Sequence, residues 1–413
     1  MKGLGVRLSI ENRQSAGYRE DTDFKKFTTS FASSLDLPQG SFDLNFGYQQ
    51  KEFGAYDFYT PGQGYPSKEW TRTYLLDSGF NLNKGDLIIK PNFLWRRHFD
   101  RFVLDKRVPS YFTSNHRTDT YTPNIYFQKE TGVLGKVGLG LEYGEERITS
   151  TALGRHNRGH RSIFFDDARD LTWKLSSGLS FRFDDFSGFG KVYTGSFNLR
   201  YEIVEQQFLR LGVSRSMRAP SFTELYYDDH KTTVGNSSLS SEKSLNYEAG
   251  YEIKKDKLLA GSTLFLRQEN DFIDWVESNA GSNKFQAENI PGANVFGIES
   301  RLELELSENI NLKTNYTYIN KSVDDNGYLY KYGQNYARHL LNSELIFKLP
   351  FITQSLGFTY KQKPGRNGWF LLNSRTDYPL NKNVEVFLSI TNILNLEYQE
   401  IEGIPQPGRW IEG

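Results

Sequence analysis

Apolar and polar residues alternate one by one along many short segments of this chain, and this period of two constrains its fold more than any other feature. From 245 to 252, each apolar residue is followed by a polar residue or glycine, and the apolar set is Leu245, Tyr247, Ala249 and Tyr251. Successive side chains of a β-strand point to opposite faces, so this segment would present one apolar and one polar face. The alternation recurs along the whole chain and predicts an all-β protein.

About 20 strands are expected from this alternation and from the turn residues that interrupt it. The last of them begins near Arg409 and is incomplete. The others are expected at 4–12, 23–35, 40–50, 69–81, 85–97, 111–128, 132–145, 160–168, 171–183, 190–203, 206–216, 242–253, 257–270, 286–306, 309–321, 337–349, 352–363, 367–378 and 382–391.

The connections between these strands alternate between short and long. Short turns are expected at 37–40, 83–85, 129–132, 254–257 and 306–309, and long loops at 51–68, 98–110, 144–160, 215–241, 271–290 and 321–337. Bacterial outer-membrane barrels have tight periplasmic turns at one end and long extracellular loops at the other. We therefore predict a transmembrane antiparallel β-barrel with its apolar faces toward lipid. A soluble sandwich or propeller is the alternative.

The composition is compatible with a membrane barrel. Hydrophobic residues make up 37% of the chain and the mean hydropathy is −0.60, as a polar lumen and long wet loops would require. Aromatic residues reach 15%, which suits interfacial girdles and loop tips that grip ligands. No run of about 18 apolar residues is present, so helical membrane spans are excluded. No linker divides the 413 residues, and a single barrel domain over 1–413 is expected.

Several kinds of function are excluded by the residues themselves. The 50 basic and 50 acidic residues give a net charge of zero, without the basic stripe that nucleic-acid binding requires. The chain has no cysteine, so disulfides and thiolate metal sites are impossible. There is no glycine-rich phosphate loop or nucleophile elbow, and the six histidines pair with no nucleophile by sequence. We therefore expect that the chain is not an enzyme and that it holds no resident cofactor. The exception is calcium, which is considered below.

A series of short motifs occurs in a fixed order along the chain. They are Phe53-Gly54-Ala55, Arg218-Ala219-Pro220-Ser221-Phe222, Glu224-Leu225-Tyr226, Gly235-Asn236, Glu242-Lys243-Ser244, Asn289, Gly297-Ile298-Glu299, Asn392-Ile393-Leu394-Asn395 and Pro407-Gly408-Arg409. In this order and spacing they resemble the C-terminal barrel of TonB-dependent outer-membrane receptors, and the cobalamin-receptor branch in particular.

The resemblance implies a barrel of about 22 strands, preceded by a plug domain, a TonB box and a signal peptide. No apolar leader follows Met1, so the chain is expected to be a fragment truncated at both ends. It also implies a monomer in the outer membrane of a Gram-negative bacterium, which contacts the lipid bilayer and reaches the TonB complex only through the N-terminal region.

The function implied by the resemblance is TonB-dependent uptake of a bulky, scarce nutrient, either cobalamin or a ferric siderophore. A passive outer-membrane channel or an outer-membrane hydrolase is the alternative. Aromatics in the expected loops are the candidate ligand contacts, because Tyr and Trp combine a large apolar surface with a polar group. The candidates are Tyr56, Phe58, Tyr59, Tyr226, Tyr227 and Trp275. Packing within the loops or at the membrane surface is the alternative role.

A calcium site is a further expectation that follows from the resemblance. Asp21 and Asp23 lie in the first expected loop and Asp57 in the next long one. In cobalamin-type receptors, acidic loop residues at such places can bind calcium, which prefers several oxygen ligands. Solvation of an acidic loop tip is the alternative.

Overall fold

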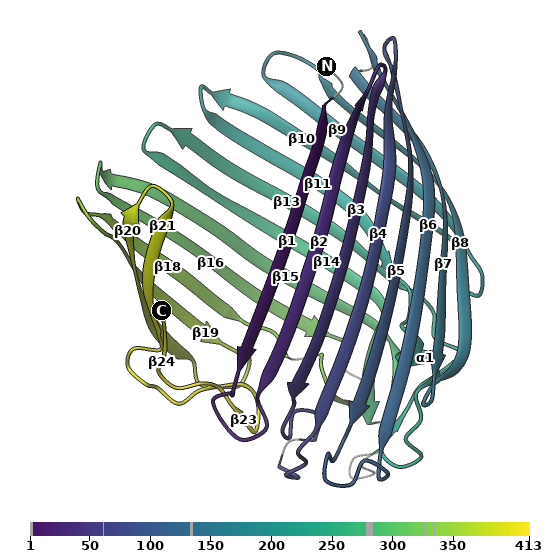
Figure 1. Ribbon diagram of the computed structural model, residues 1–413. Helices are drawn as coiled ribbons and strands as arrows, with labels where there is room; N and C mark the ends of the chain where they lie inside the picture. The colour runs from purple at the N-terminus through teal and green to yellow at the C-terminus, as the bar shows by residue number, and fades with distance from the viewer. Residues whose placement is uncertain (1–2, 61, 133–134, 278–283, 325–326, 334) are drawn as a thin grey trace.

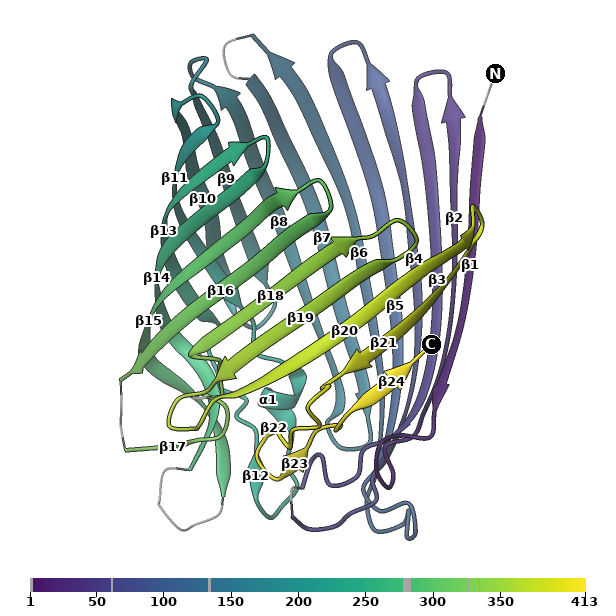
Figure 2. The same ribbon diagram turned by 90° about the vertical axis from the view of Figure 1, so that its left-hand side faces the viewer.

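Nearly the whole chain forms one strongly curved β-sheet (Figures 1 and 2). The computed structural model describes residues 3–60, 62–132, 135–277, 284–324, 327–333 and 335–413. The elements are β1 (Leu4–Ser15), β2 (Phe24–Leu37), β3 (Gly40–Gly54), β4 (Lys68–Lys84), β5 (Leu87–Val103), β6 (Thr113–Thr131), β7 (Gly135–Ser150), β8 (Gly154–Asp170), β9 (Leu175–Phe186), β10 (Gly190–Val204), β11 (Gln207–Arg218), α1 (Phe222–Tyr226), β12 (Thr233–Val234), β13 (Glu242–Lys255), β14 (Leu258–Glu277), β15 (Phe285–Ser307), β16 (Ile310–Val323), β17 (Leu329–Tyr330), β18 (His339–Lys348), β19 (Thr353–Gln362), β20 (Trp369–Asn381), β21 (Val384–Thr391), β22 (Gln399–Ile401), β23 (Ile404–Pro405) and β24 (Trp410–Glu412).

The expected fold class is confirmed. The main sheet has 22 strands, of which β12 and β17 are two-residue strands inside loops. The other strands of this sheet follow one another in chain order with antiparallel pairing, from β1–β2 through β21–β24. Within the described residues, no helix is long and apolar enough to span a membrane, and α1 has five residues.

The two faces of the sheet differ as the alternation predicts. On β13 the outward side chains include Tyr247 and Tyr251, which are 44% and 41% exposed although they are large and apolar. Their neighbours Glu248 and Glu252 share the lumen face with Arg210 of β11, which donates a hydrogen bond to Glu252 over 2.9 Å. Large apolar side chains are exposed on most of the long strands, as a lipid-facing surface requires.

Two of the expected long loops are wrong. Residues 144–160 belong mostly to β7 and β8, which are joined by a tight turn at 151–153. Residues 271–277 and 285–290 extend β14 and β15 well past their neighbours. The ends of β7 and β8 are mostly polar on both faces, whereas the extension of β14 and β15 carries buried apolar residues on both faces. In either case the period-two alternation ends where the strand does not. The sequence pattern therefore marks the membrane segment and misses the extracellular extension.

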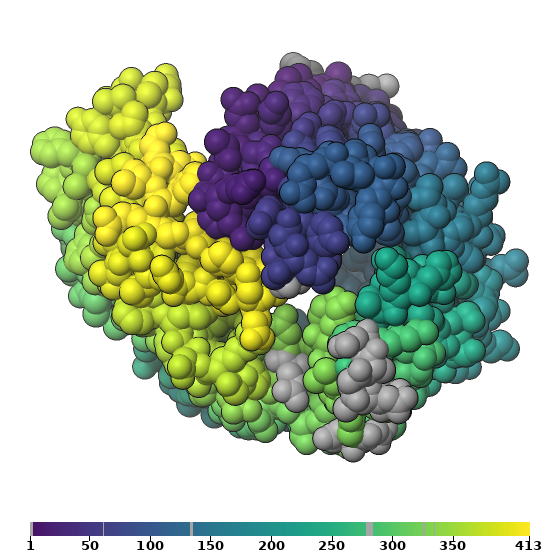
Figure 3. Space-filling model, turned by 90° about the horizontal axis from the view of Figure 1, so that it is seen from below, coloured from purple at the N-terminus to yellow at the C-terminus, as the bar shows by residue number. Residues whose placement is uncertain are grey.

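The two edges of the curved sheet face each other across a gap. In the described chain, β1 is paired only with β2, and β24 only with β21. Figure 3 shows this gap between the purple and yellow strands when the molecule is viewed from the loop end. At that end the gap is bridged, because the Tyr18 hydroxyl donates a hydrogen bond to the Pro405 carbonyl over 2.8 Å.

Candidate functional site

A short helix at the loop end of the barrel starts the candidate site. Helix α1 begins after Pro220, and its N-cap Ser221 forms a capping box with Glu224. The Ser221 hydroxyl accepts from the Glu224 amide at 3.2 Å, and the Glu224 carboxylate accepts from the Ser221 amide at 2.7 Å. This reciprocal pair satisfies two of the amides that a helix start leaves free. The motif Ser-Phe-Thr-Glu thus specifies a turn that projects from the barrel rim.

Arg218 fixes this helix to the barrel wall. Its guanidinium lies between two carboxylates, donating to Glu224 at 2.9 and 3.0 Å and to Glu242 at 2.6 and 2.7 Å. Glu242 also accepts from the backbone amide of Ile273 on β14 at 2.7 Å. Bidentate pairs of this kind are strong and directional. A single arginine therefore joins α1, β13 and, through Glu242, β14.

The ionisation of Glu224 is coupled to the docking of helix α1 on the barrel wall. Burial alone would raise its pKa, but hydrogen bonds from the Arg218 guanidinium and the Ser221 amide hold the pKa of Glu224 below its ordinary value. An acid with a lowered pKa stabilises the folded state above its unfolded pKa of about 4.3, and that contribution is lost as the pH falls through the folded value.

We therefore expect docking of α1 to be constant between about pH 5 and pH 8 and to weaken below about pH 4. Hydrogen exchange of residues 218–242 across this range measures it. The variant Glu224→Gln should be less protected throughout and should lose most of the acid step. An identical acid step in the variant would contradict this assignment.

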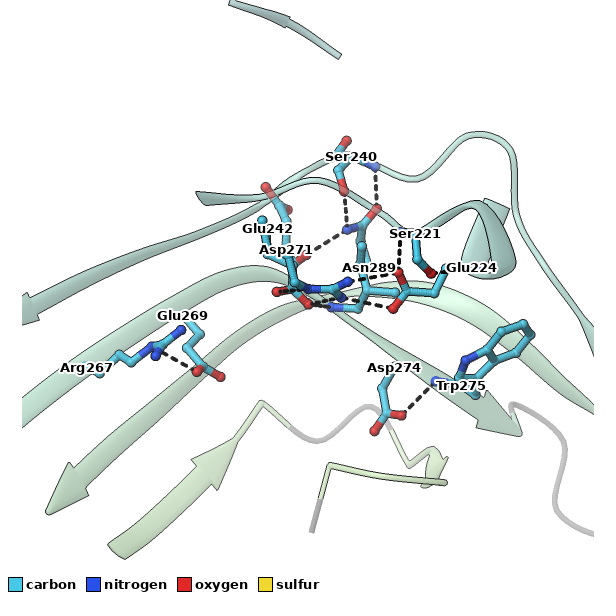
Figure 4. A network of polar contacts seen from close by, with 12 residues as sticks. Ser221, Glu224, Ser240, Glu242, Arg267, Glu269, Asp271, Asp274, Trp275 and Asn289 are labelled. Carbon is cyan, nitrogen blue, oxygen red and sulfur yellow. Dashed lines mark hydrogen bonds and ion pairs between the residues drawn. The ribbon is translucent and has the colours of Figure 1, made fainter. Parts of the chain in front are cut away.

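The extension of β14 and β15 forms a platform for two neighbouring loops. On one side, β12 pairs in parallel with Phe285 and Gln286 of β15. On the other, β17 pairs with Val276 and Glu277 of β14. Asn289 of β15 exchanges hydrogen bonds with the Ser240 backbone at 2.8 and 3.1 Å (Figure 4). Loops 218–242 and 323–339 are thereby held over the lumen by the same hairpin.

Asp274 holds the second of these loops. Its carboxylate is 3% exposed and accepts from the amides of Tyr332 at 3.2 Å and Gly333 at 2.5 Å. It also accepts from the amide of its neighbour Trp275 at 2.8 Å (Figure 4). The Lys331 amide donates to the Trp275 carbonyl at 3.0 Å. One buried carboxylate thus fixes the backbone at 331–333.

A cavity of about 580 Å³ lies beneath these loops, on the lumen side of β11 and β13–β16. Tyr332 and Tyr336 line it from loop 323–339, and Tyr332 is 56% exposed. The Lys321 ammonium lies 4.3 Å from the Phe272 ring centroid and 2.9 Å from a Glu269 oxygen. The full lining is Ser216, Met217, Arg218, Glu224, Glu242, Lys243, Ser244, Arg267, Glu269, Phe272, Ile273, Asp274, Trp275, Val295, Ile319, Lys321, Tyr332, Gly333, Asn335 and Tyr336.

This lining combines the exposed phenol ring of Tyr332 and the half-buried ring of Tyr336 with cations and carboxylates that form ion pairs with each other. Aromatic faces pack against flat ligands, and guanidinium and ammonium groups attract oxyanions. In the described chain, no group of three or more acidic or histidine side chains is arranged to hold a metal ion. The arrangement is suited to non-covalent capture of a bulky, polar and partly aromatic ligand.

Three of the predicted anchors pack mainly within the loop assembly. Trp275 is 8% exposed and forms a buried cluster with Leu225, Leu239, Ile273 and Ala287. Tyr227 lies against it edge-on, with ring centroids 6.5 Å apart. Tyr226 stacks on His156 at the β7–β8 turn, with centroids 3.5 Å apart. Of these three residues, only Trp275 is among the described residues that line the cavity.

The other three predicted anchors lie over a different part of the rim, in the loop between β3 and β4. Phe58 and Tyr59 are 46% and 54% exposed, and Tyr59 packs edge-on against Phe102 of β5 at 4.8 Å. The Tyr59 hydroxyl donates to Glu69 at 2.8 Å. Tyr56 is half-buried, and the Arg19 guanidinium lies 5.4 Å from the centroid of the Tyr56 ring. The described residues that line the cavity do not include Tyr56, Phe58 or Tyr59. Ligand contact by any of the six predicted anchors stays a prediction.

The three aspartates predicted to bind calcium lie in adjacent loops and have other partners. The Asp57 carboxylate accepts from the amides of Gly62 at 2.5 Å, Gln63 at 3.1 Å and Gly64 at 2.9 Å. Asp21 forms an ion pair with Lys106, and Asp23 with Lys68 at 3.4 Å. The Asp57 bonds close its own loop, as an aspartate at a turn commonly does. Calcium binding by these residues stays a prediction.

Tyr332 and Tyr336 were missed by the sequence analysis. They lie in the loop expected at 321–337, in a stretch that also contains Tyr328 and Tyr330. The criterion that selected the other candidates, aromatics in a long loop, applies equally to this stretch. The sequence signal that could have identified this loop is its four tyrosines within nine residues.

The fold and the cavity define the class of protein. An outward apolar face, tight turns at one end and a polar cavity beneath long loops at the other are the features of an outer-membrane barrel that receives ligands. The chain belongs to the family described as TonB dependent receptor-like, beta-barrel, which matches residues 7–393. It is accordingly a protein of the outer membrane of a Gram-negative bacterium, and its relatives are receptors rather than enzymes.

Individual relatives refine the comparison. The chain is 29% identical over 183 residues to the ferrienterobactin receptor of Escherichia coli K12, a match that covers 39% of this chain and 24% of that protein. It is 30% identical over 270 residues to the ferric enterobactin receptor of Pseudomonas aeruginosa, covering 53% of this chain and 36% of that protein. These relatives are siderophore receptors, so the expected place in the cobalamin-receptor branch is wrong.

Solved structures show the same fold. The siderophore receptor PirA from Pseudomonas aeruginosa superposes with a TM-score of 0.77 at 19% identity, covering 98% of this chain and 72% of that one. The ferric-catecholate import receptor Fiu from Escherichia coli K12 gives a TM-score of 0.78 at 12% identity, covering 99% and 76%.

Proposed function

We propose that this chain is the barrel of a receptor for TonB-dependent uptake of a ferric siderophore. The observation that carries the proposal is the cavity beneath the β14–β15 platform, with Tyr332 and Tyr336 on its lining beside Arg218 and Lys321. A ferric siderophore of the catecholate class is bulky, anionic and aromatic. Tyrosine faces match its rings. Family membership and the siderophore receptors among its relatives support the same conclusion.

Substitution of the two cavity tyrosines tests the proposal. Each of Tyr332→Ala and Tyr336→Ala should weaken binding of ferric enterobactin by up to about tenfold, because an aromatic contact contributes about 0.5–1.5 kcal/mol beyond area burial. The double variant should lose more than either single variant. Dissociation constants for the intact receptor can be measured by quenching of its intrinsic fluorescence.

The matched control is Tyr378→Ala on β20, an outward tyrosine that is 42% exposed. Its affinity for ferric enterobactin should be unchanged. Binding of the double cavity variant within twofold of the parent would contradict this site. Uptake that persists in cells without the TonB complex would instead favour the passive channel.

A further inference from the structure

The side-chain amide of Asn335 lies on the cavity lining with one end engaged and the other end free. Asn335 is exposed and belongs to loop 323–339. Its Oδ1 accepts a hydrogen bond from the Lys363 ammonium at 2.7 Å. An ammonium only donates, so this contact sets which end of the amide is the oxygen. Within the part of the chain that the structure describes, the Asn335 Nδ2 group has no acceptor, which leaves two N–H donors for a ligand.

The backbone around Asn335 is fixed by the two cavity tyrosines. The backbone amide of Asn335 donates to the Tyr332 carbonyl at 2.8 Å. The neighbouring Tyr336 is held through its hydroxyl, which accepts from the backbone amide of Lys321 on β16 at 3.1 Å. The free amide donor therefore lies in a segment that is already bonded to the barrel wall. A donor that is fixed before the ligand arrives loses little conformational freedom on binding.

Lys363 is held from its other side by the last extracellular loop. It directly follows β19, and its side chain is 13% exposed. Its ammonium also donates to the Glu400 carbonyl and lies 4.0 Å from a carboxylate oxygen of Glu400. Lys361 binds that carboxylate more closely, at 2.5 Å. The charge of Lys363 therefore acts mainly on the Asn335 oxygen, and a cation on this oxygen polarises the amide and strengthens its N–H donors.

The charged donors of the cavity are already engaged by carboxylates. Arg267 and Lys321 both bind Glu269, at 3.1 and 2.9 Å. The pairs are Arg218 with Glu224 and Glu242, Lys243 with Asp271, Arg267 with Glu269, and Lys321 with Glu269. A ligand oxygen must displace a carboxylate to reach any of these four cations. The amide of Asn335 requires no such displacement.

We propose that Asn335, positioned by Lys363, donates hydrogen bonds to an acceptor oxygen of the ligand in this cavity. Iron-bound catecholate oxygens carry negative charge, and hydrogen bonds to charged acceptors are stronger than those between neutral groups. Tyr332 and Tyr336 supply aromatic faces for the ligand, and the amide fixes its orientation. The inference rests on the proposed function, because it takes the ligand to be a ferric siderophore.

The variant Asn335→Asp separates hydrogen-bond donation from loop structure. The aspartate has the same shape and keeps an oxygen for Lys363, but it has no N–H donor and carries a negative charge. Its affinity for ferric enterobactin should fall by about tenfold to a hundredfold, as for the loss of a hydrogen bond to a charged group. Without ligand, hydrogen-exchange protection of the Arg338 amide, which donates to the Gln362 carbonyl at 2.8 Å, should equal that of the parent. The matched control is Asn315→Asp on the lumen face of β16, outside the cavity lining, and it should bind like the parent.

The positioning role of Lys363 is tested by combining two substitutions. Asn335→Ala alone should weaken binding of ferric enterobactin by about tenfold, and Lys363→Met alone by about fivefold. Because the lysine acts through the amide, the double variant should bind like Asn335→Ala alone. The control Lys313→Met removes another exposed ammonium from the lumen face, on β16 and outside the cavity lining. Its affinity should equal that of the parent.

Three results would overturn this inference while leaving the proposed function in place. The first is binding of Asn335→Asp within twofold of the parent when the Tyr332→Ala, Tyr336→Ala variant is weakened. The second is reduced protection of Arg338 in Asn335→Asp, which would assign its loss of affinity to the structure of the loop. The third is a further loss when Lys363→Met is added to Asn335→Ala, which would show that the lysine does not act through the amide. A parent receptor that does not bind ferric enterobactin would contradict the proposed function, and the role of Asn335 with it.

Discussion

Replacement of Trp275 by alanine is expected to release the extracellular loops from the β14–β15 platform. Its side chain is 8% exposed and lies at the centre of the cluster that joins α1 to the hairpin. Removal of a buried tryptophan costs about 3–5 kcal/mol, which exceeds what a few loop hydrogen bonds contribute. Residues 218–242 should become sensitive to proteases while the barrel strands stay protected, and limited proteolysis with mass spectrometry measures this.

Trp275→Phe provides the matched comparison, because it keeps a ring in the cluster and should preserve most of the protection. Trp369→Ala on β20 removes another tryptophan, one that contacts Tyr398 at 4.7 Å and lies outside this cluster. It should leave loop 218–242 protected. Protection of this loop in Trp275→Ala equal to the parent would show that Trp275 has no part in loop docking.

The fold could be predicted because its signal is repeated along every strand. Each long strand repeats the same alternation, as on β13, where Tyr247 and Tyr251 face outward and Glu248 and Glu252 inward. An error in one strand does not alter the pattern of the others. The order of tight turns and long loops then fixes which end is extracellular.

The strand ends could not be predicted in the same way. The β7–β8 hairpin continues to residues 150 and 154, but its outward residues there are Arg147, Thr149 and Arg155. Polar residues on both faces have no period-two hydrophobic signal, although backbone pairing continues. The sequence analysis therefore assigned these strand ends to a loop.

The sequence predicted the kind of site, aromatic residues in the extracellular loops, but not which residues form it. Aromatic loop residues are present at the rim as expected, yet Trp275 is buried and Tyr332 is 56% exposed. Both are aromatics near charged residues, and nothing local distinguishes them. The difference is tertiary, because Trp275 lies on a strand that α1 covers, whereas Asp274 fixes the Tyr332 backbone over the cavity. A loop residue can be assigned to packing or to ligand contact only when its neighbours in space are known.

Asp274→Ala is expected to free loop 323–339 from the platform. The substitution leaves the amides of Tyr332 and Gly333 without their acceptor, and each buried unsatisfied donor costs about 1–3 kcal/mol. Exchange at Gly333 should accelerate by about a hundredfold or more, because 1.4 kcal/mol corresponds to a factor of ten. Asp274→Asn keeps one acceptor oxygen and should give an intermediate rate.

The control Asp377→Ala removes a lumen carboxylate that pairs with Arg375 at 2.7 Å, and it should leave the exchange rate at Gly333 unchanged. If Gly333 exchanges at the parent rate in Asp274→Ala, the backbone at 331–333 is held by its pairing with β14 alone, and Tyr332 owes its position over the cavity to β17.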